Sequence, residues 1–177
     1  MTQYRKDLLV NGEVYHIYSR SISKYVIFND EHEYNRMYQL LDLYRYRDFY
    51  YKLSQFNSLT NISQNEIIEN LKIDRDLYVE IMAYCIMPTH IHLILKQVSK
   101  KGVEKYVARA LNGYSRYFNV KHQRIGPLWS SRFKSVLVKN DDQLLHLTRY
   151  LHLNPTSIGL VDKPEKWIYS SYKEFTS

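Results

Sequence analysis

The stretch that decides the fold is an apolar run interrupted by one proline, and it reads Ile81-Met82-Ala83-Tyr84-Cys85-Ile86-Met87-Pro88-Thr89-His90-Ile91-His92-Leu93-Ile94-Leu95. Pro88 has no N–H to donate to a sheet ladder, so it predicts two strands joined by a tight turn. Alternate side chains of a strand share a face, so His90 and His92 point the same way. With a rise of ~3.3 Å per residue their Cβ atoms lie roughly 7 Å apart, which suits two imidazoles that converge on one divalent metal ion. The pattern alone is a weak signal, because strand histidines are more often packed or exposed than bound to a metal.

The composition is that of an ordinary globular chain with two departures. Its 177 residues, 45% hydrophobic and 24% charged, predict a single domain over residues 1–177 with a real core. The departures are a formal net charge of +7 and a total of 18 tyrosines. Excess cations with interleaved rings suit a partner that offers phosphates and bases. The alternatives are that the charge serves solubility alone or an acidic protein partner.

Several classes of protein are excluded at this stage. Residues 1–7 lead into a very short apolar run, so we identify no signal peptide, and no apolar segment approaches membrane-spanning length. Cys85 is the single cysteine and cannot form an internal disulfide; in a buried strand we expect it to be an inert apolar filler. We therefore expect a cytoplasmic protein that does not associate with a membrane.

Hydrophobic periodicity predicts the order of the other elements. Read along the chain, the elements form the pattern β-α-β-β-α-β followed by a helix, which is the split pattern of ferredoxin-like sheets. We expect an α+β fold in which an antiparallel sheet, with the histidine strand at its centre, is covered by helices. The predicted strands are 14–20, 78–86, 90–96 and 132–139, the predicted helices are 30–51, 67–71, 103–120 and 141–154, and residues 54–65 are predicted to be a loop.

Cations recur on two predicted helices. In the helix 103–120, the residues Lys105, Arg109, Asn112 and Arg116 form a stripe without an acid, which favours contact with a phosphate backbone. The alternative is an ordinary solvated face. The end of the first helix, residues 44–51, mixes rings and cations; there we favour a solvated end with snorkelling side chains over a base-stacking surface.

The last predicted helix carries a polar stripe beside its leucines. His146, Tyr150 and Asn154 are four residues apart, so they share one face. A lone tyrosine there would be read as cover for the core edge. The presence of Asn154 changes the interpretation, because its amide oxygen can complete the coordination shell of a metal ion bound by two histidines. The phenol of Tyr150 would then lie beside the group that the metal ion polarises and could react with it.

Three motifs and a closing segment resemble those of a known family. The stretch 83–93 resembles the His-hydrophobic-His (HUH) motif of single-tyrosine transposases, and the forms Gly-Pro-Leu-Trp and Tyr-Leu-His-Leu-Asn-Pro point to the REP-associated tyrosine transposase branch. The resemblance covers the chain from Val14 to Tyr172. The other stretches that carry it are Gly126-Pro127-Leu128-Trp129-Ser130-Ser131-Arg132-Phe133-Lys134-Ser135, Arg149-Tyr150-Leu151-His152-Leu153-Asn154-Pro155 and Trp167-Ile168-Tyr169-Ser170-Ser171-Tyr172.

The resemblance implies a chemistry and a partner. It implies that His90 and His92 hold Mg²⁺ or Mn²⁺, that Asn154 is the third ligand where other branches carry glutamine, and that Tyr150 is the nucleophile. The implied reaction is the cleavage and rejoining of single-stranded DNA near hairpins through a 5′-phosphotyrosyl link, without a nucleotide cofactor and in a monomer rather than a dimer. The residues expected to bind the DNA are Arg20, Lys105, Arg109, Arg116, Trp129, Arg132 and Lys134.

Two features depart from the family pattern, and three points stay open. The segment 54–76 is longer than expected, and the family's Arg-Gly after the first strand is Arg20-Ser21 here. A non-catalytic module that binds hairpin DNA or RNA on the same fold is the first alternative, and a protein-interaction domain with structural histidines is the second. The sequence names no sure general base, since His146 and His152 are more readily interpreted as surface residues.

Overall fold

The computed structural model describes residues 8–176, which form four strands and six α-helices. Every neighbouring pair of strands is antiparallel, and the sheet order is β2-β3-β1-β4. This is the predicted ferredoxin-like arrangement, with the histidine strand β3 inside the sheet. The strands are β1 Val14–Arg20, β2 Val79–Met87, β3 His90–Gln97 and β4 Lys134–Leu137; the helices are α1 Glu31–Tyr44, α2 Leu53–Phe56, α3 Asn61–Asp74, α4 Gly102–Lys121, α5 Asp141–Ser157 and α6 Tyr172–Thr176; and the 3₁₀ turns are η1 Ile22–Lys24 and η2 Pro164–Lys166.

The proline hairpin forms as predicted. Met87 pairs with His90 across the turn at Pro88 and Thr89, so β2 and β3 lie side by side in the sheet. Their side chains then alternate between the two faces. Ile91, Leu93 and Leu95 join the large core on one face, whereas Ile94 belongs to a smaller apolar cluster on the other. His90 and His92 therefore lie on the face of the smaller cluster.

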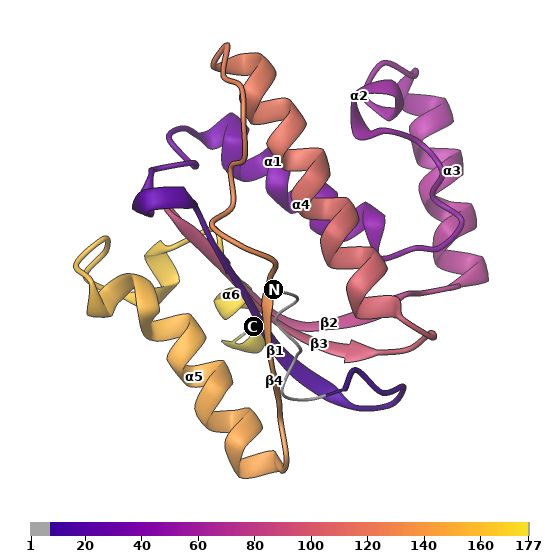
Figure 1. Cartoon of the computed structure of the whole chain (residues 1–177). Coiled ribbons are helices and arrows are strands. Elements are labelled where there is room, and N and C mark those ends of the chain that lie inside the picture. Colours follow the sequence, from indigo (N-terminus) through magenta and orange to yellow (C-terminus); the bar gives the residue numbers. More distant parts are fainter. Residues whose placement is uncertain (1–7, 177) are drawn as a thin grey trace.

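Different helices cover the two faces of the sheet (Figure 1). Helices α1 and α4 lie against one face, and α5 lies on the opposite side. Leu151 of α5 is fully buried in the smaller cluster with Cys85 and Met87 of β2, so this helix is packed directly over the histidine face. Burial raises the pKa of the Cys85 thiol to about 12, which agrees with the predicted role as an inert filler.

The first helix ends at Tyr44, so the prediction that it continues to residue 51 is wrong. After α1 the chain bonds to the segment that enters β2: the N–H of Arg47 donates to the carbonyl of Asp76, and the N–H of Tyr78 donates to the carbonyl of Arg45, both at 2.8 Å. These tertiary bonds outweigh the helical propensity of the segment. Its rings divide accordingly: Phe49 is buried in the core, while Tyr50 is exposed.

Two further boundaries were predicted wrongly for local reasons. Residues 54–65 are not a loop, because α2 occupies part of them and Thr60 caps α3 by accepting from the N–H of Ser63 at 3.3 Å. Helix α5 does not end at Asn154. Pro155 lacks an N–H and so removes one helical hydrogen bond, but the N–H of Ile158 still donates to the carbonyl of Asn154 at 3.3 Å, and the helix continues to Ser157.

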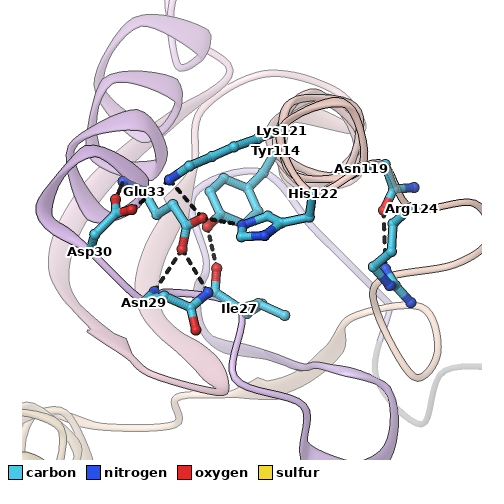
Figure 2. A network of polar contacts seen from close by, with 9 residues as sticks. All are labelled: Ile27, Asn29, Asp30, Glu33, Tyr114, Asn119, Lys121, His122 and Arg124. Atoms are coloured by element: carbon cyan, nitrogen blue, oxygen red, sulfur yellow. Dashed lines mark hydrogen bonds and ion pairs between the residues drawn. The ribbon is translucent and has the colours of Figure 1, made fainter.

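A buried carboxylate joins the start of α1 to the end of α4 (Figure 2). Glu33 has no exposed surface, and its oxygens accept from the N–H of Asn29 at 2.6 Å, from Nζ of Lys121 at 2.9 Å and from Nε2 of His122 at 2.5 Å. Just before Asn29, the N–H of Ile27 donates to the carbonyl of Pro88 at 2.9 Å. The network therefore fixes the segment that supports the turn before the histidines.

The C-terminal segment packs along the outer edge of β2. Tyr169 stacks on Tyr34 of α1 with ring centroids 3.8 Å apart, and Nε1 of Trp167 donates to the carbonyl of Ile86 at 3.1 Å. These residues are packing anchors, as predicted, and so is Tyr172, whose ring meets His152 edge-on. None of the helices within residues 8–176 combines the length and the apolar character that crossing a membrane requires.

Candidate active site

Two imidazoles lie side by side on the face of β3 that α5 covers. The ring centroids of His90 and His92 are 5.0 Å apart, and the rings are nearly perpendicular. In each ring the Nδ1 atom has a neighbour: Oγ1 of Thr89 lies 3.0 Å from Nδ1 of His90, and Nε2 of His16 lies 3.0 Å from Nδ1 of His92. The Nε2 atom of His92 is buried and finds no hydrogen-bond partner among residues 8–176. A buried nitrogen without a partner is the atom that a metal ion would satisfy.

The surroundings keep both imidazoles neutral. Burial lowers the pKa of His90 to about 4, and the positive charge of Arg20 lowers it further in the same direction. Burial, followed by the neighbouring His90 and His16, lowers the pKa of His92 to about 3. A neutral imidazole is the form that binds a metal ion, so both histidines are ready to act as ligands at neutral pH.

Helix α5 brings Tyr150 over the same face. The buried side chain of Leu151 fixes the helix against the smaller apolar cluster. The ring of Tyr150 then meets the ring of His92 edge-on, with centroids 6.0 Å apart, while 53% of the tyrosine remains exposed. Asn154, one helical turn later, is only 8% exposed. The phenol is thus beside the imidazoles and still open to a substrate.

The available side chains limit which ligands a metal ion could have. Within residues 8–176 there is no group of three or more His, Cys, Asp or Glu side chains arranged to hold a metal ion. Nε2 of His16 is directed at Nδ1 of His92, so it does not point to the same place as Nε2 of His92, and the amide oxygen of Asn154 is the candidate for a third protein ligand. Two imidazole nitrogens and one oxygen fit a divalent first-row ion such as Mn²⁺, and they fit Mg²⁺ less well because Mg²⁺ prefers oxygen.

Two other candidates for the chemistry, Tyr114 and His152, have partners elsewhere in the structure. Tyr114 is fully buried on α4, across the sheet, and its hydroxyl donates to the carbonyl of Ile27. The interpretation of His152 as a surface residue is wrong: it is 4% exposed, and its Nε2 lies 2.8 Å from Oγ of Ser171. His146 is exposed, as expected.

The predicted DNA-binding residues fall into two groups. Arg20 pairs in register with His90, and Lys134 pairs with Tyr18, so both come from strands at the histidine site. Lys105, Arg109 and Arg116 belong to α4, on the other side of the sheet (Figure 1).

Arg109 of this second group, and Trp129 in the segment after α4, have internal contacts. Arg109 donates to the carbonyls of Phe49 and Tyr51 and stacks on Tyr44 with 4.1 Å between the guanidinium carbon and the ring centroid, so it holds a loop. Nε1 of Trp129 donates to the carbonyl of Leu111 at 3.2 Å, and Arg132 lines a groove of about 690 Å³ between α4 and the segment 126–133. The structure thus brings Arg20 and Lys134 to the histidines and leaves the other five elsewhere.

Sequence reasoning missed His16. It lies on β1, two residues before Tyr18, and reaches His92 because the register places Tyr18 opposite His92. The alternation of β1 puts His16 and Tyr18 on one face, but no local signal tells which face that is.

Comparison with known families identifies the chain. A family model described as "Transposase IS200 like" matches residues 34–154. The chain belongs to this IS200-like transposase family. The match includes the histidine hairpin and runs through Tyr150 to Asn154, so the strand that carries the two histidines and the helix that carries Tyr150 lie within the matched residues.

Individual relatives agree with this membership in the IS200-like family. A protein of Haemophilus influenzae named "Putative REP-associated tyrosine transposase" is 30% identical over 103 residues, and the REP-associated tyrosine transposase of Escherichia coli is 25% identical over 107 residues. The matched regions cover 52% and 58% of this chain, and 58% and 59% of the two relatives, so the chain spans less than two thirds of either. The recognition of the family from the motifs is confirmed.

The fold of this IS200-like chain has been seen before. A solved structure described as a REP-associated tyrosine transposase bound to a REP hairpin superposes with a TM-score of 0.62 at 16% identity, covering 98% of this chain and 84% of that one. At that identity the likeness shows the fold alone, and it agrees with the predicted α+β class.

Proposed function

We propose that this protein cleaves and rejoins single-stranded DNA beside hairpins, with Tyr150 as the nucleophile. One observation carries the proposal: a half-exposed phenol stands edge-on to His92, whose buried Nε2 has no partner among the described residues. Membership in a transposase family and relatives named for REP-associated tyrosine transposases support the same activity. A relative bound to a REP hairpin supports hairpin DNA as the partner.

The proposed step is a transesterification that conserves bonds and electrons. The phenol oxygen of Tyr150 attacks the scissile phosphorus, a Tyr–O–P bond forms, and the bond from phosphorus to the 3′-oxygen breaks. The phenol loses a proton to solvent, and the departing oxygen gains one as a 3′-hydroxyl. The 5′-phosphotyrosine then keeps the bond energy for rejoining, when the 3′-hydroxyl attacks and releases the tyrosine. No oxidant, reductant or nucleotide is needed.

His90, His92 and Asn154 would hold the divalent ion. When bound, the ion supplies charge neutralisation at the scissile phosphate and polarises its oxygens. The protein contributes two neutral imidazoles in a fixed perpendicular arrangement and a buried amide one helical turn after the nucleophile. We infer that Mn²⁺ binds more tightly here than Mg²⁺, because two of the three donors are nitrogens.

Arg20 and Lys134 would hold the phosphates next to the scissile one. Both side chains are exposed, and their strands border the histidine site. Exposed cations of this kind position a nucleic acid without reading its sequence. On α4, Lys105 and Arg116 are exposed as well, and with Arg132 beside the groove they would form a second basic surface for a hairpin stem. We do not include Arg109 and Trp129, since their polar atoms are used internally.

The decisive experiment traps the covalent intermediate. The protein is incubated with Mn²⁺ and a 3′-labelled DNA hairpin carrying a single-stranded flank, and denaturation-resistant adducts are mapped by mass spectrometry. We expect the label on Tyr150 and no adduct from Tyr150→Phe, which keeps the ring and its packing. Tyr117→Phe, on α4 across the sheet, is the matched control and should form the adduct normally. A label on another tyrosine refutes the assignment, and hairpin binding without any adduct would favour a non-catalytic binding module.

A further inference from the structure

A third histidine touches the site without belonging to its ligands. His16 of β1 is buried, and its ring lies nearly parallel to that of His92, with 5.2 Å between centroids and an angle of 16°. Its Nε2 is 3.0 Å from Nδ1 of His92. His16 also lies outside residues 34–154, the part of the chain that the family model matches.

The contact between the two rings decides which atom of His92 can bind a metal. A hydrogen bond between two neutral imidazoles contains one proton, carried by one ring and accepted by the other. If His92 carries it on Nδ1, then its Nε2 holds a free lone pair. If His16 carries it on Nε2, then His92 must be protonated at its own Nε2 and cannot bind a metal ion through that atom.

The surroundings of His92 favour the first arrangement. Its Nε2 is buried and has no partner within residues 8–176, so a proton there would be a buried donor without an acceptor. A lone pair at the same place is satisfied as soon as a metal ion binds. In His90, too, the atom with a neighbour is Nδ1, which contacts Oγ1 of Thr89, so Nε2 is again the atom left for a metal ion.

We infer that His16 is a positioning residue that accepts the Nδ1–H of His92, thereby holding its ring in place and its Nε2 free for the metal ion. The inference rests on the proposed function, since it gives the metal site a supporting residue. Histidine ligands in proteins usually donate to a carboxylate or a backbone carbonyl. Here the acceptor is a neutral imidazole, which adds no negative charge to the site.

Substitutions at His16 separate this role from simple packing. His16→Phe keeps a ring of similar size and removes the acceptor, whereas His16→Gln keeps an acceptor oxygen on a side chain of similar reach. Mn²⁺ affinity is measured by calorimetry and by the metal-dependent rise in Tm, neither of which needs activity. We expect His16→Phe to bind Mn²⁺ roughly 10- to 100-fold more weakly, the range found for such supporting residues, and His16→Gln to recover most of the loss. His32→Phe, at an exposed histidine of α1, should leave the affinity unchanged.

A second measurement reads the proton directly. Long-range ¹H–¹⁵N spectra of the metal-free wild type should show His92 with its proton on Nδ1, and His16→Phe should reduce the population of that form. A proton on Nε2 of His92 in the wild type, or equal Mn²⁺ affinity in wild type and His16→Phe, would overturn the role of His16. A wild type that binds no Mn²⁺ but shows the Nδ1–H form would count against the proposed metal site and leave the hydrogen bond standing.

Discussion

Nε2 of His152 lies 2.8 Å from Oγ of Ser171, and this contact fastens the helix that carries Tyr150 to the C-terminal segment. The same hydroxyl accepts from the N–H of Tyr84 at 3.0 Å, and the N–H of Ser171 donates to the carbonyl of Tyr84 at 3.0 Å. Three parts of the chain, α5, β2 and the segment after η2, therefore meet at one serine. The placement of Tyr150 over the histidines depends on a residue near the end of the chain.

Ser171→Ala tests this fastening. The substitution leaves two buried groups, Nε2 of His152 and the N–H of Tyr84, without their partner, so we expect the free energy of unfolding to fall by about 2 kcal/mol in urea titrations. Cleavage should slow more than hairpin binding weakens, because the helix that carries the proposed nucleophile is held less firmly. Ser157→Ala removes an exposed hydroxyl bond on the same helix and should change stability by less than about 0.5 kcal/mol. Equal effects of the two substitutions would contradict the role of Ser171.

Glu33→Gln tests the network of Figure 2. Burial alone would raise the pKa of the Glu33 carboxyl, but the hydrogen bonds that it accepts outweigh burial and hold the pKa below its usual range. Because the folded pKa is lowered, the carboxylate stabilises the fold above the usual glutamate pKa, and this is lost as the pH falls through the folded value. We expect Glu33→Gln to lower the free energy of unfolding at pH 7 by about 2–3 kcal/mol, and the difference to shrink in acid. Asp162→Asn, in an exposed pair with Lys166, should have a much smaller effect on the free energy of unfolding.

Arg20 and Arg109 should respond in opposite ways to truncation. Arg20→Ala is expected to lower the salt dependence of hairpin binding by about 0.7–0.9 in the slope of log K against log salt, as for one lost phosphate contact, and to leave folding unchanged. Arg109→Ala should destabilise the fold, because the carbonyls of Phe49 and Tyr51 lose their donor, and leave the slope unchanged. The salt series and a urea titration on both variants decide this. A lower slope for Arg109→Ala would show that α4 binds DNA through that residue.

The fold could be predicted where short-range pattern and topology agree. Pro88 between two apolar runs sets a two-residue hairpin, and the period of two places His90 with His92. Helix α4 was also predicted within one residue at each end, because its apolar stripe is continuous. The predicted boundaries are wrong where contacts between distant parts of the chain set the end of an element. The end of α1 depends on hydrogen bonds to the segment before β2, and the sequence of α1 itself gives no sign of them.

In the candidate site, too, the residues that local spacing relates could be predicted, and those that tertiary contacts bring together could not. Tyr150 and Asn154 could be placed on one helix face from spacing alone, and their resemblance to a transposase motif supplied the role. His16 could not be assigned, because its contact with His92 depends on the register between β1 and β3. Arg109 was assigned to DNA by its position in a stripe, whereas its contacts with Phe49 and Tyr51 depend on how the chain turns after α1.

The last prediction concerns the acid sensitivity of the folded protein. The pKa values of His90 and His92 are lowered to about 4 and about 3, while both residues in the unfolded chain titrate near ~6.5. Below a pH of about 6.5 the two histidines bind protons in the unfolded state but not in the folded state. The free energy of unfolding should therefore be constant above about pH 7 and fall as the pH drops toward 5. Urea titrations at half-unit steps between pH 5 and 8 measure the slope.

His92→Ala identifies the source of that slope. Removing this histidine takes away up to one proton of the difference, so the slope should become shallower by at most about 1.4 kcal/mol per pH unit. Ser157→Ala, at an exposed residue of α5 that does not titrate, should leave the slope as it is. Added Mn²⁺ should raise the free energy of unfolding of the wild type by a nearly constant amount between pH 5 and 8, because both folded imidazoles are already neutral there, and should raise that of His92→Ala much less. Identical slopes in all three proteins would show that the buried histidines are not the source of the acid sensitivity. An equal stabilisation of wild type and His92→Ala by Mn²⁺ would show that the ion does not bind through His92.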